Sequence, residues 1–146
     1  MSEFSSARFA ILTGKMQCHA CMSPTEVSCL LIPGVSQGQE DDRFDPEDPA
    51  RLQYITDINA EALTAWQELA PYMRWMTSHT ANATYLANTC EHCNALQGDW
   101  FIGEPDAPFF PTCRAGINAL NCKWVEVPLR AEAEASQSSW MNEIVG

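Results

Sequence analysis

Short runs of apolar and β-branched residues alternate along the chain with loops rich in proline, glycine and acidic residues. Residues 8–13 predict a short strand, and residues 26–34 predict a second strand that stops at Pro33 and Gly34. The segment between them contains QCHAC, in which the two cysteines are separated by two residues. We therefore expect a β-hairpin whose turn is built around two thiols.

A second cysteine pair lies in a similar setting further along the chain. Residues 83–90 predict a strand that enters the sequence CEHC, and residues 97–103 predict a turn and a strand that leave it. Residues 104–113 contain three prolines and predict an irregular segment. Residues 123–129 predict an edge strand that is closed by Pro128.

Two further segments favour helix. Asn59 is a favourable N-cap for residues 60–70, Glu61 in the first turn suits the helix dipole, and Pro71 ends the helix. Apolar residues recur there at spacings of three and four, and we expect this stripe to lie in the core. The stripe consists of Leu63, Trp66, Leu69 and Met73. The tail, residues 130–146, is rich in the helix formers Ala and Glu. Its expected anchors are Trp140, Met141 and Ile144.

The composition is that of a folded, strongly acidic domain. The chain has 146 residues, 46% of them apolar, with 8 basic against 19 acidic side chains and a formal net charge of −11. A chain of this length can bury a sizeable core as one domain. Phosphate backbones and anionic membranes repel an acidic surface, so we expect neither nucleic acid nor a membrane as partner. A basic protein would be attracted to it.

Acidic residues are concentrated in the loop at residues 35–50. They are Glu40, Asp41, Asp42, Asp45, Glu47 and Asp48. A solvated loop is the simpler interpretation of such a run. The functional interpretation is a surface that attracts a basic partner, which makes these six residues the candidate partner-binding set.

The expected location is cytoplasmic. The apolar run at residues 9–12 is shorter than the core of a secretion signal, and no run approaches the length of a membrane span. In a reducing compartment the seven cysteines would be thiols, metal ligands or catalysts.

The two Cys-x-x-Cys pairs together supply the four thiolates of a structural zinc site, because each such turn directs two sulfurs at one point. The predicted ligands are Cys18, Cys21, Cys90 and Cys93. The pairs are separated by 68 residues, far more than in a compact zinc finger. Closing a loop of that length costs only about 1.2 kcal/mol more than closing a loop of roughly 17 residues, so the spacing does not exclude the site. We expect Zn²⁺ as the cofactor.

Other roles for these residues stay open. A thiol oxidoreductase would place the first thiol of the motif at a helix N-terminus, but Pro24 and the β-branched run after the first pair oppose a helix there. A site of three thiolates and one imidazole would use His19 or His92. We expect a buried Cys29, free thiols in the core at Cys113 and Cys122, and a surface position for His79.

The residues around the second pair resemble a known pattern. The segment YLANTCEHCNALQGDWF is similar to a motif, Y-x-x-N-x-C-x-x-C-x-x-x-Q-G-D-x-F, of poorly characterised bacterial zinc-ribbon proteins that carry a Cys-x-x-Cys hairpin upstream. The matching residues are Tyr85, Asn88, Cys90, Cys93, Gln97, Gly98, Asp99 and Phe101. The resemblance implies a metal and a fold, and it implies no activity.

These patterns predict an α+β fold. Zinc-ribbon-like antiparallel β-hairpins would be joined by one four-cysteine zinc site, with a helical insertion between the two Cys-x-x-Cys turns, or knuckles. We expect a single domain over residues 1–146. Its parts are knuckle one at 8–34, the acidic loop and helical insertion at 35–80, knuckle two at 81–103 and a C-terminal extension at 104–146.

Three functions fit this picture. The one we favour is a non-enzymatic protein-binding module, in its sharpest form a bacterial immunity protein that neutralises a basic toxin such as a nuclease. Nucleic-acid binding would need a basic face, and the basic residues are few and dispersed. The third is a thiol-disulfide oxidoreductase. The aromatic residues considered for a binding surface are Trp100, Trp124 and Trp140, whereas Phe109 and Phe110 fit a core-capping role equally well.

Overall fold

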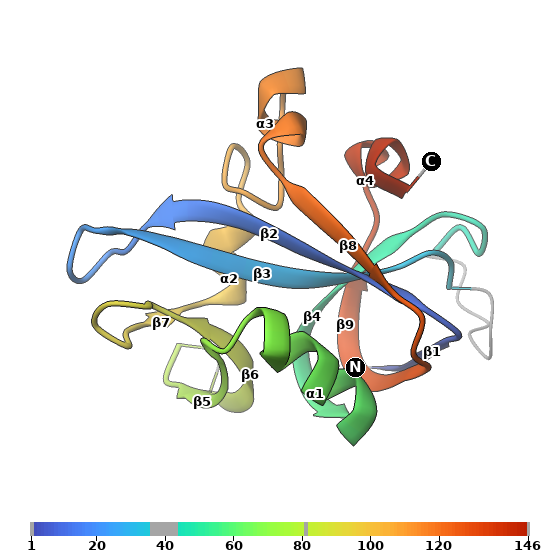
Figure 1. Cartoon of the computed structure of the whole chain (residues 1–146), viewed down its shortest axis with the longest axis horizontal. Helices are drawn as coiled ribbons and strands as arrows, with labels where there is room; N and C mark the ends of the chain where they lie inside the picture. The colour runs from blue at the N-terminus through green and yellow to red at the C-terminus, as the bar shows by residue number, and fades with distance from the viewer. Residues whose placement is uncertain (1, 36–43, 81, 146) are drawn as a thin grey trace.

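Antiparallel pairing organises most of the chain in the computed structural model, which describes residues 2–35, 44–80 and 82–145. Within these ranges nine strands form one sheet in the order β1-β9-β4-β3-β2-β8, and β5, β6 and β7 branch from β4 through β6 (Figure 1). The strands are β1 (Ser2–Ser6), β2 (Phe9–Gln17), β3 (Pro24–Ile32), β4 (Ala50–Ile58), β5 (Met73–Ser78), β6 (Ala83–Thr89), β7 (Leu96–Gln97), β8 (Asn121–Val125) and β9 (Leu129–Ser136). The helices are α1 (Ala60–Leu69), α2 (Asp99–Ile102), α3 (Arg114–Asn118) and α4 (Ser139–Val145). The fold is therefore mostly antiparallel sheet with short helices.

The β2–β3 hairpin confirms the first predicted pair of strands and extends both of them to the cysteine turn. Its register runs from Ala10 opposite Leu31 to Gln17 opposite Pro24. Strand β6 confirms the strand predicted before the second cysteine pair, and a short bridge to β7 completes a second hairpin. Each cysteine pair thus lies at the end of two antiparallel strands.

The sheet carries a hydrophobic core on both faces. Ile11 of β2 belongs to the cluster that contains Trp66 of α1, whereas its neighbour Leu12 belongs to the cluster that contains Trp140 of α4. Figure 1 shows α1 and the β5–β6 hairpin on one side of β2 and β3, with α3 and α4 on the other. Continuous apolar runs in β2 and β3 follow from this double burial.

The tail forms a strand where the abundance of Ala and Glu predicted a helix. Strand β9 lies between β1 and β4, and its side chains alternate between the core and solvent. Leu129, Ala131 and Ala133 are buried, whereas Arg130, Glu132 and Glu134 are exposed. Helix propensities differ by less than about 1 kcal/mol per residue, so sheet pairing on both sides outweighs them. Only α4 is helical, and its expected anchors Trp140 and Met141 are buried.

Two predicted strands need correction. Residues 97–103 contain the end of β7 and then helix α2, because the carbonyl of Gly98 accepts the N–H groups of Phe101 and Ile102 and closes a helical turn. Residues 123–129 span the end of β8 and the first residue of β9. Strand β8 lies at the edge of the sheet, as predicted.

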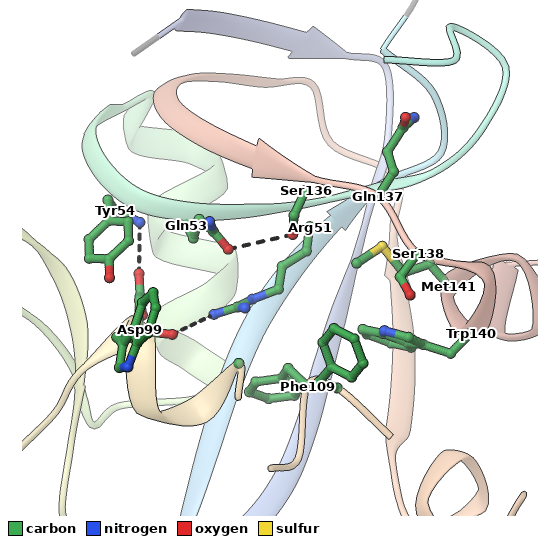
Figure 2. A pocket seen from close by; sticks show the side chains of 13 residues that line it. Arg51, Gln53, Tyr54, Asp99, Phe109, Ser136, Gln137, Ser138, Trp140 and Met141 are labelled. Atoms are coloured by element: carbon green, nitrogen blue, oxygen red, sulfur yellow. Dashed lines mark hydrogen bonds between the residues drawn. The ribbon is translucent and has the colours of Figure 1, made fainter. Parts of the chain in front are cut away.

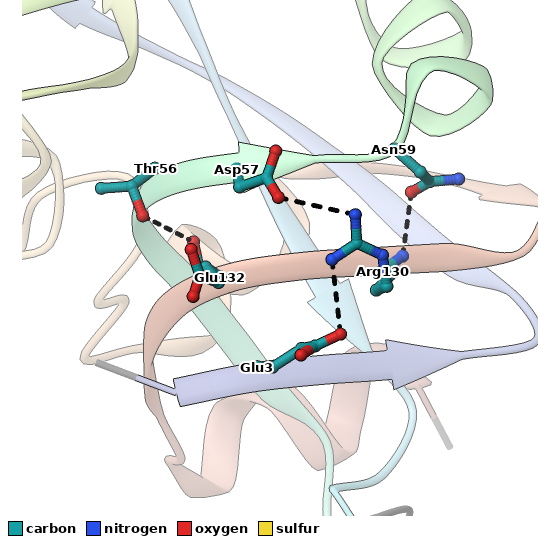
Figure 3. A network of polar contacts seen from close by, with 6 residues as sticks. All are labelled: Glu3, Thr56, Asp57, Asn59, Arg130 and Glu132. Atoms are coloured by element: carbon teal, nitrogen blue, oxygen red, sulfur yellow. Dashed lines mark hydrogen bonds and ion pairs between the residues drawn. The ribbon is translucent and has the colours of Figure 1, made fainter.

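Asn59 precedes α1 as expected, but its side chain does not cap the helix. It accepts the N–H of Arg130 at 2.9 Å and donates to the carbonyl of Pro128 at 2.9 Å, which ties the start of α1 to β9. The Arg130 guanidinium also pairs with Glu3 of β1 at 3.3 Å and Asp57 of β4 at 3.5 Å (Figure 3). One side chain therefore joins three neighbouring strands.

The apolar stripe predicted for α1 is only partly buried. Ala62 and Trp66 face the core, and Leu63 packs against it, but Leu69 is 38% exposed. Met73 is buried in β5 rather than in the helix. The predicted helical insertion at residues 35–80 thus also contains β4 and β5.

Candidate metal centre

The two hairpins bring the four predicted cysteines together. The Sγ atoms of Cys18, Cys21, Cys90 and Cys93 all lie within 4.8 Å of one another. The Cys18–Cys93 and Cys21–Cys90 sulfur pairs are 3.6 and 3.7 Å apart. Four thiolates at zinc–sulfur distances of about 2.3 Å around a tetrahedron would lie about 3.8 Å from one another. The cluster therefore has the size and the donor set to hold a metal ion such as zinc.

Knuckle one has a tight backbone turn that presents N–H groups to its sulfurs. The Cys18 N–H donates to the carbonyl of Ser23 at 2.9 Å, and the Met22 N–H donates back to the carbonyl of Cys18 at 3.0 Å. Met22 has a φ of 65°, which closes the turn. The Ala20 N–H points at the Cys18 sulfur at 3.4 Å. Such donors stabilise a thiolate.

Knuckle two repeats this geometry bond for bond. The Cys90 N–H donates to the carbonyl of Ala95 at 2.9 Å, and the Asn94 N–H donates to the carbonyl of Cys90 at 3.0 Å. Asn94 has a φ of 64°, and the His92 N–H lies 3.4 Å from the Cys90 sulfur. Two equivalent turns that face each other are what a shared four-sulfur centre requires.

The thiols of the cluster have opposite pKa shifts. The backbone N–H groups of Cys21 and Ala20 outweigh the effect of burial and lower the pKa of Cys18 to about 6. The backbone N–H of Ala95 acts to lower the pKa of Cys93, but burial and the other three sulfurs raise it to about 11. Like charges at short range produce such a split, and a divalent cation between the sulfurs would relieve it.

Gln97 connects the second hairpin to a sulfur of the first. Its Nε2 donates to the Cys18 sulfur at 3.3 Å and to the carbonyl of Ala95 at 3.0 Å, and the side chain is 1% exposed. A donor to a thiolate orients it and tunes its affinity for a metal. The sequence pattern around the second cysteine pair includes Gln97 but predicted no role for it. Its position seven residues after Cys90 is the feature of the sequence that could have identified it.

The two histidines of the knuckles hold the hairpins together. His19 Nε2 lies 2.8 Å from the carbonyl of Leu96, and His92 Nε2 lies 2.9 Å from the carbonyl of Pro24. A carbonyl only accepts, so Nε2 is protonated in both rings. Each imidazole thus reaches from its own knuckle to the opposite hairpin. Among the described residues, the cluster of potential metal ligands contains the four cysteines and neither histidine.

The remaining motif residues have structural contacts around the centre. The Asn88 side chain accepts the N–H of Ser28 at 2.7 Å and donates to the Ser28 carbonyl at 3.0 Å, which joins β6 to β3 like one rung of a sheet. The Tyr85 hydroxyl accepts the N–H of Asp99 at 3.2 Å. Phe101, in contrast, is 55% exposed. Asn88 therefore joins the two hairpins, and Tyr85 holds the first residue of α2.

No family model matches the chain, and neither a curated protein nor a solved structure matches it. Among the described residues, no helix is long and apolar enough to cross a membrane.

The other cysteines lie outside the cluster. Cys29 is buried as predicted, and burial raises the pKa of its thiol to about 12. Cys113 and Cys122 are free thiols, but both are exposed, so the prediction that they lie in the core is wrong. His79 lies at the surface, as expected. Each knuckle is followed by a strand, β3 or β7, so neither cysteine pair has the helix N-terminus of a redox motif.

The acidic candidates are only partly within the described residues. Glu40, Asp41 and Asp42 lie outside them. Asp45 and Glu47 are exposed and Asp48 is half-buried. The Gln137 side chain donates to the carbonyls of Asp45 and Asp48 at 2.8 and 3.1 Å and so holds this end of the loop against the sheet.

Proposed function

We propose that this protein is a non-enzymatic, zinc-binding module that binds a basic protein. Zinc on the four cysteines would fix the two hairpins relative to each other, and the partner would contact the aromatic surface beside them. The observation that carries the proposal is a pair of exposed aromatic side chains next to the knuckles of a strongly acidic chain.

The aromatic surface consists of Trp100 and Phe101 on α2. They are 67% and 55% exposed. Both line a hollow of about 390 Å³ that also includes His19 and Leu96 of the two knuckles. Large exposed apolar side chains that gather in one place favour protein recognition, and Trp is common at the centres of interfaces. Of the other aromatic candidates, Trp124 is half-buried and Trp140 is buried, so neither supplies this surface.

The donor set supports zinc as the resident ion. Four cysteine sulfurs in two knuckles with tetrahedral spacing are typical of structural zinc, which is closed to substrates. Soft sulfur ligands select against magnesium and calcium. A closed structural site also agrees with a non-enzymatic role.

Charge favours a basic protein over nucleic acid as partner. The chain carries a net charge of −11. Several of its cations are already engaged, because Arg8 pairs with Glu126, Arg114 pairs with Glu143, and Arg51 is buried. A nucleic-acid-binding surface needs clustered, accessible cations.

The sharpest form of this proposal is a bacterial immunity protein that blocks a basic toxin, such as a nuclease, by covering its active surface. The acidic loop would speed the encounter through long-range attraction, and the aromatic surface would supply affinity at contact. The strongly acidic charge of the chain supports this form.

The test is capture of partners from the native cell by immobilised, zinc-loaded protein. The matched control is the Trp100→Ser/Phe101→Ser variant, which removes the exposed rings and keeps every cysteine. We expect a basic protein that is captured by the native chain and lost with the control. Growth of a host that expresses the captured protein should be restored by the native chain and not by the control. Binding of DNA or RNA at about 150 mM salt, or turnover of a disulfide substrate, would contradict the proposal.

The acidic loop is tested separately. The Asp45→Lys/Glu47→Lys/Asp48→Lys variant should bind the captured partner with a slower association rate and a weaker dependence on salt, while dissociation stays nearly unchanged. An unchanged association rate would remove the loop from the mechanism.

A further inference from the structure

A second cavity lies between β4, α2 and the start of α4, and none of the four clustered cysteines lines it. Its volume is about 200 Å³. Much of its wall is aromatic: the rings belong to Tyr54, Trp100, Phe109, Phe110 and Trp140. Figure 2 shows Arg51 extending towards Asp99, whereas Trp140 lies on the opposite side of the pocket. The exposed side chains of Trp100 and Phe110 connect this cavity to solvent.

Two buried N–H donors in the wall have no partner. Arg51 and Trp140 are each 4% exposed, and neither Arg51 Nε nor Trp140 Nε1 makes a hydrogen bond. Both groups can only donate. Buried donors in folded proteins are nearly always paired, so two unpaired ones in one cavity indicate an acceptor supplied from outside the chain.

The charges around the cavity are already balanced. Arg51 Nη2 donates to the backbone carbonyl of Asp99 at 3.2 Å, and the Asp99 carboxylate accepts the N–H of Tyr54 at 2.7 Å. Burial raises the pKa of Asp99 to about 6, so the carboxylate is ionised at neutral pH and compensates the guanidinium. An anionic ligand would add an uncompensated negative charge to a buried site in an acidic protein.

The backbone at the cavity is strained. Tyr54 has a φ of 52° and lies where the pairing of β4 with β9 shifts register. This conformation directs its N–H to Asp99, while its ring contacts that of Tyr85 with centroids 5.1 Å apart. Residues held in such conformations are frequent at ligand sites.

We propose that this cavity binds a small, uncharged aromatic molecule that carries a carbonyl acceptor, the class of single-ring aromatic amides. A cavity of about 150 Å³ accepts benzene, so the observed volume suits one ring with an amide substituent. The ring lies among the aromatic walls, and the carbonyl oxygen accepts from Trp140 Nε1 or Arg51 Nε. The cavity shares Tyr54 and Trp100 with the hollow at α2, but the proposal does not rest on the function proposed for that surface.

The probe is benzamide, titrated into the zinc-loaded full chain and followed by ligand-observed NMR. Two matched compounds separate the contributions of the ring, the acceptor and the charge to binding. Toluene keeps the ring without the acceptor, and benzoate adds a negative charge. Benzamide is expected to bind at least several-fold more tightly than either compound. Competition between benzamide and toluene is expected, because both rings occupy one cavity.

Two variants locate the site. Trp140→Phe keeps an aromatic ring but removes the unpaired N–H, and it should weaken benzamide binding by roughly 3- to 10-fold without changing toluene binding. Gly103→Ala tests the other donor, because a Cβ there would lie 2.2 Å from Arg51 Nη1 and displace the guanidinium. The control is Trp124→Phe, which alters a half-buried Trp on β8 and should leave binding unchanged.

Three results would overturn this proposal. They are the absence of benzamide binding at the limit of its solubility, tighter binding of benzoate than of benzamide, and benzamide affinities of both Trp140→Phe and Gly103→Ala that equal the affinity of the native chain. Circular dichroism and metal content show whether each variant retains the native fold, so that loss of binding through unfolding is recognised as such.

Discussion

Gln97 is a single side chain that couples the two halves of the metal centre. It belongs to the second hairpin and donates to a sulfur of the first at 3.3 Å. A side chain that donates such a hydrogen bond lowers the energy of the thiolate, although it does not bind the metal itself. A search for metal ligands alone therefore overlooks it.

Replacement Gln97→Ala should lower the affinity for zinc by roughly 10-fold, because the Cys18 thiolate loses its side-chain donor. Competition with a chromophoric chelator measures the affinity. Gln67→Ala is the matched control, since that amide donates to the carbonyl of Met73 away from the sulfurs. Equal affinities of the Gln97 variant and the native chain would show that this hydrogen bond does not tune the centre.

Asp99 should destabilise the protein at neutral pH. Its pKa in the folded state is about 6 against an ordinary value of 3.8, with burial as the main cause. The folded state therefore holds this proton more tightly than the unfolded chain, so stability falls as pH rises from about 4 to 6 and the full cost persists above pH 6. A shift of this size corresponds to about 3 kcal/mol.

Asp99→Asn should accordingly raise the free energy of unfolding by up to about 3 kcal/mol near pH 7.5, with a difference below about 1 kcal/mol near pH 4. Urea titrations across this range measure it. Glu104→Gln is the control, because it changes an exposed carboxylate in the turn after α2. Its free energy of unfolding should differ from that of the native chain by almost the same amount at every pH. If Asp99→Asn became less stable than the native chain as pH rises, the raised pKa of Asp99 in the folded state would be wrong.

At the scale of elements, the local sequence pattern predicted the hairpins, but it did not predict the strands that depend on pairing with distant parts of the chain. The β-branched and apolar residues within 26–34 and 83–90 predict strands, and most of both ranges lies in β3 and β6. Strand β9 has Ala and Glu that favour a helix locally, and its strand conformation depends on pairing with β1 and β4 from distant parts of the chain. The four cysteines were predictable because Cys-x-x-Cys is a short local signal, whereas the contact of Gln97 depends on how two hairpins meet.

Asn88 provides a buried link between those hairpins outside the sulfurs. It is fully buried and makes two hydrogen bonds to the backbone of Ser28, whose hydroxyl accepts the indole N–H of Trp66 at 2.8 Å. Asn88→Ala would leave both backbone groups of Ser28 buried and unpaired. We expect a loss of roughly 2–4 kcal/mol in the free energy of unfolding.

Denaturant titration of the zinc-loaded protein measures this loss, and Asn121→Ala at an exposed position of β8 is the control. A change below about 0.5 kcal/mol in the Asn88 variant would mean that β3 and β6 are held together without this side chain.

At the scale of the whole molecule, the two hairpins contribute strands to different regions of one sheet, and the cysteine cluster closes the end at which they meet. Direct pairing between β4 and β6 is restricted to Ile55 opposite Leu86. The β5–β6–β7 branch is thus attached to the main sheet by few backbone bonds, together with Asn88 and the sulfurs. A metal at the cluster would therefore stabilise the contact between these two units more than either unit itself.

Removal of the metal should consequently loosen the branch before the main sheet. Freshly purified protein should contain about one zinc per chain by elemental analysis, and Cys90→Ser should contain almost none. In hydrogen exchange, a strong chelator should expose the amides of β6 and β7 first, while those of β2 and β3 away from the knuckle stay protected, because a sheet paired on both sides opens last. Cys122→Ser, which removes an exposed thiol of β8, should match the native chain in metal content and exchange. Full zinc content in Cys90→Ser, or unchanged protection of β6 after the metal is removed, would show that the cluster does not join the two units.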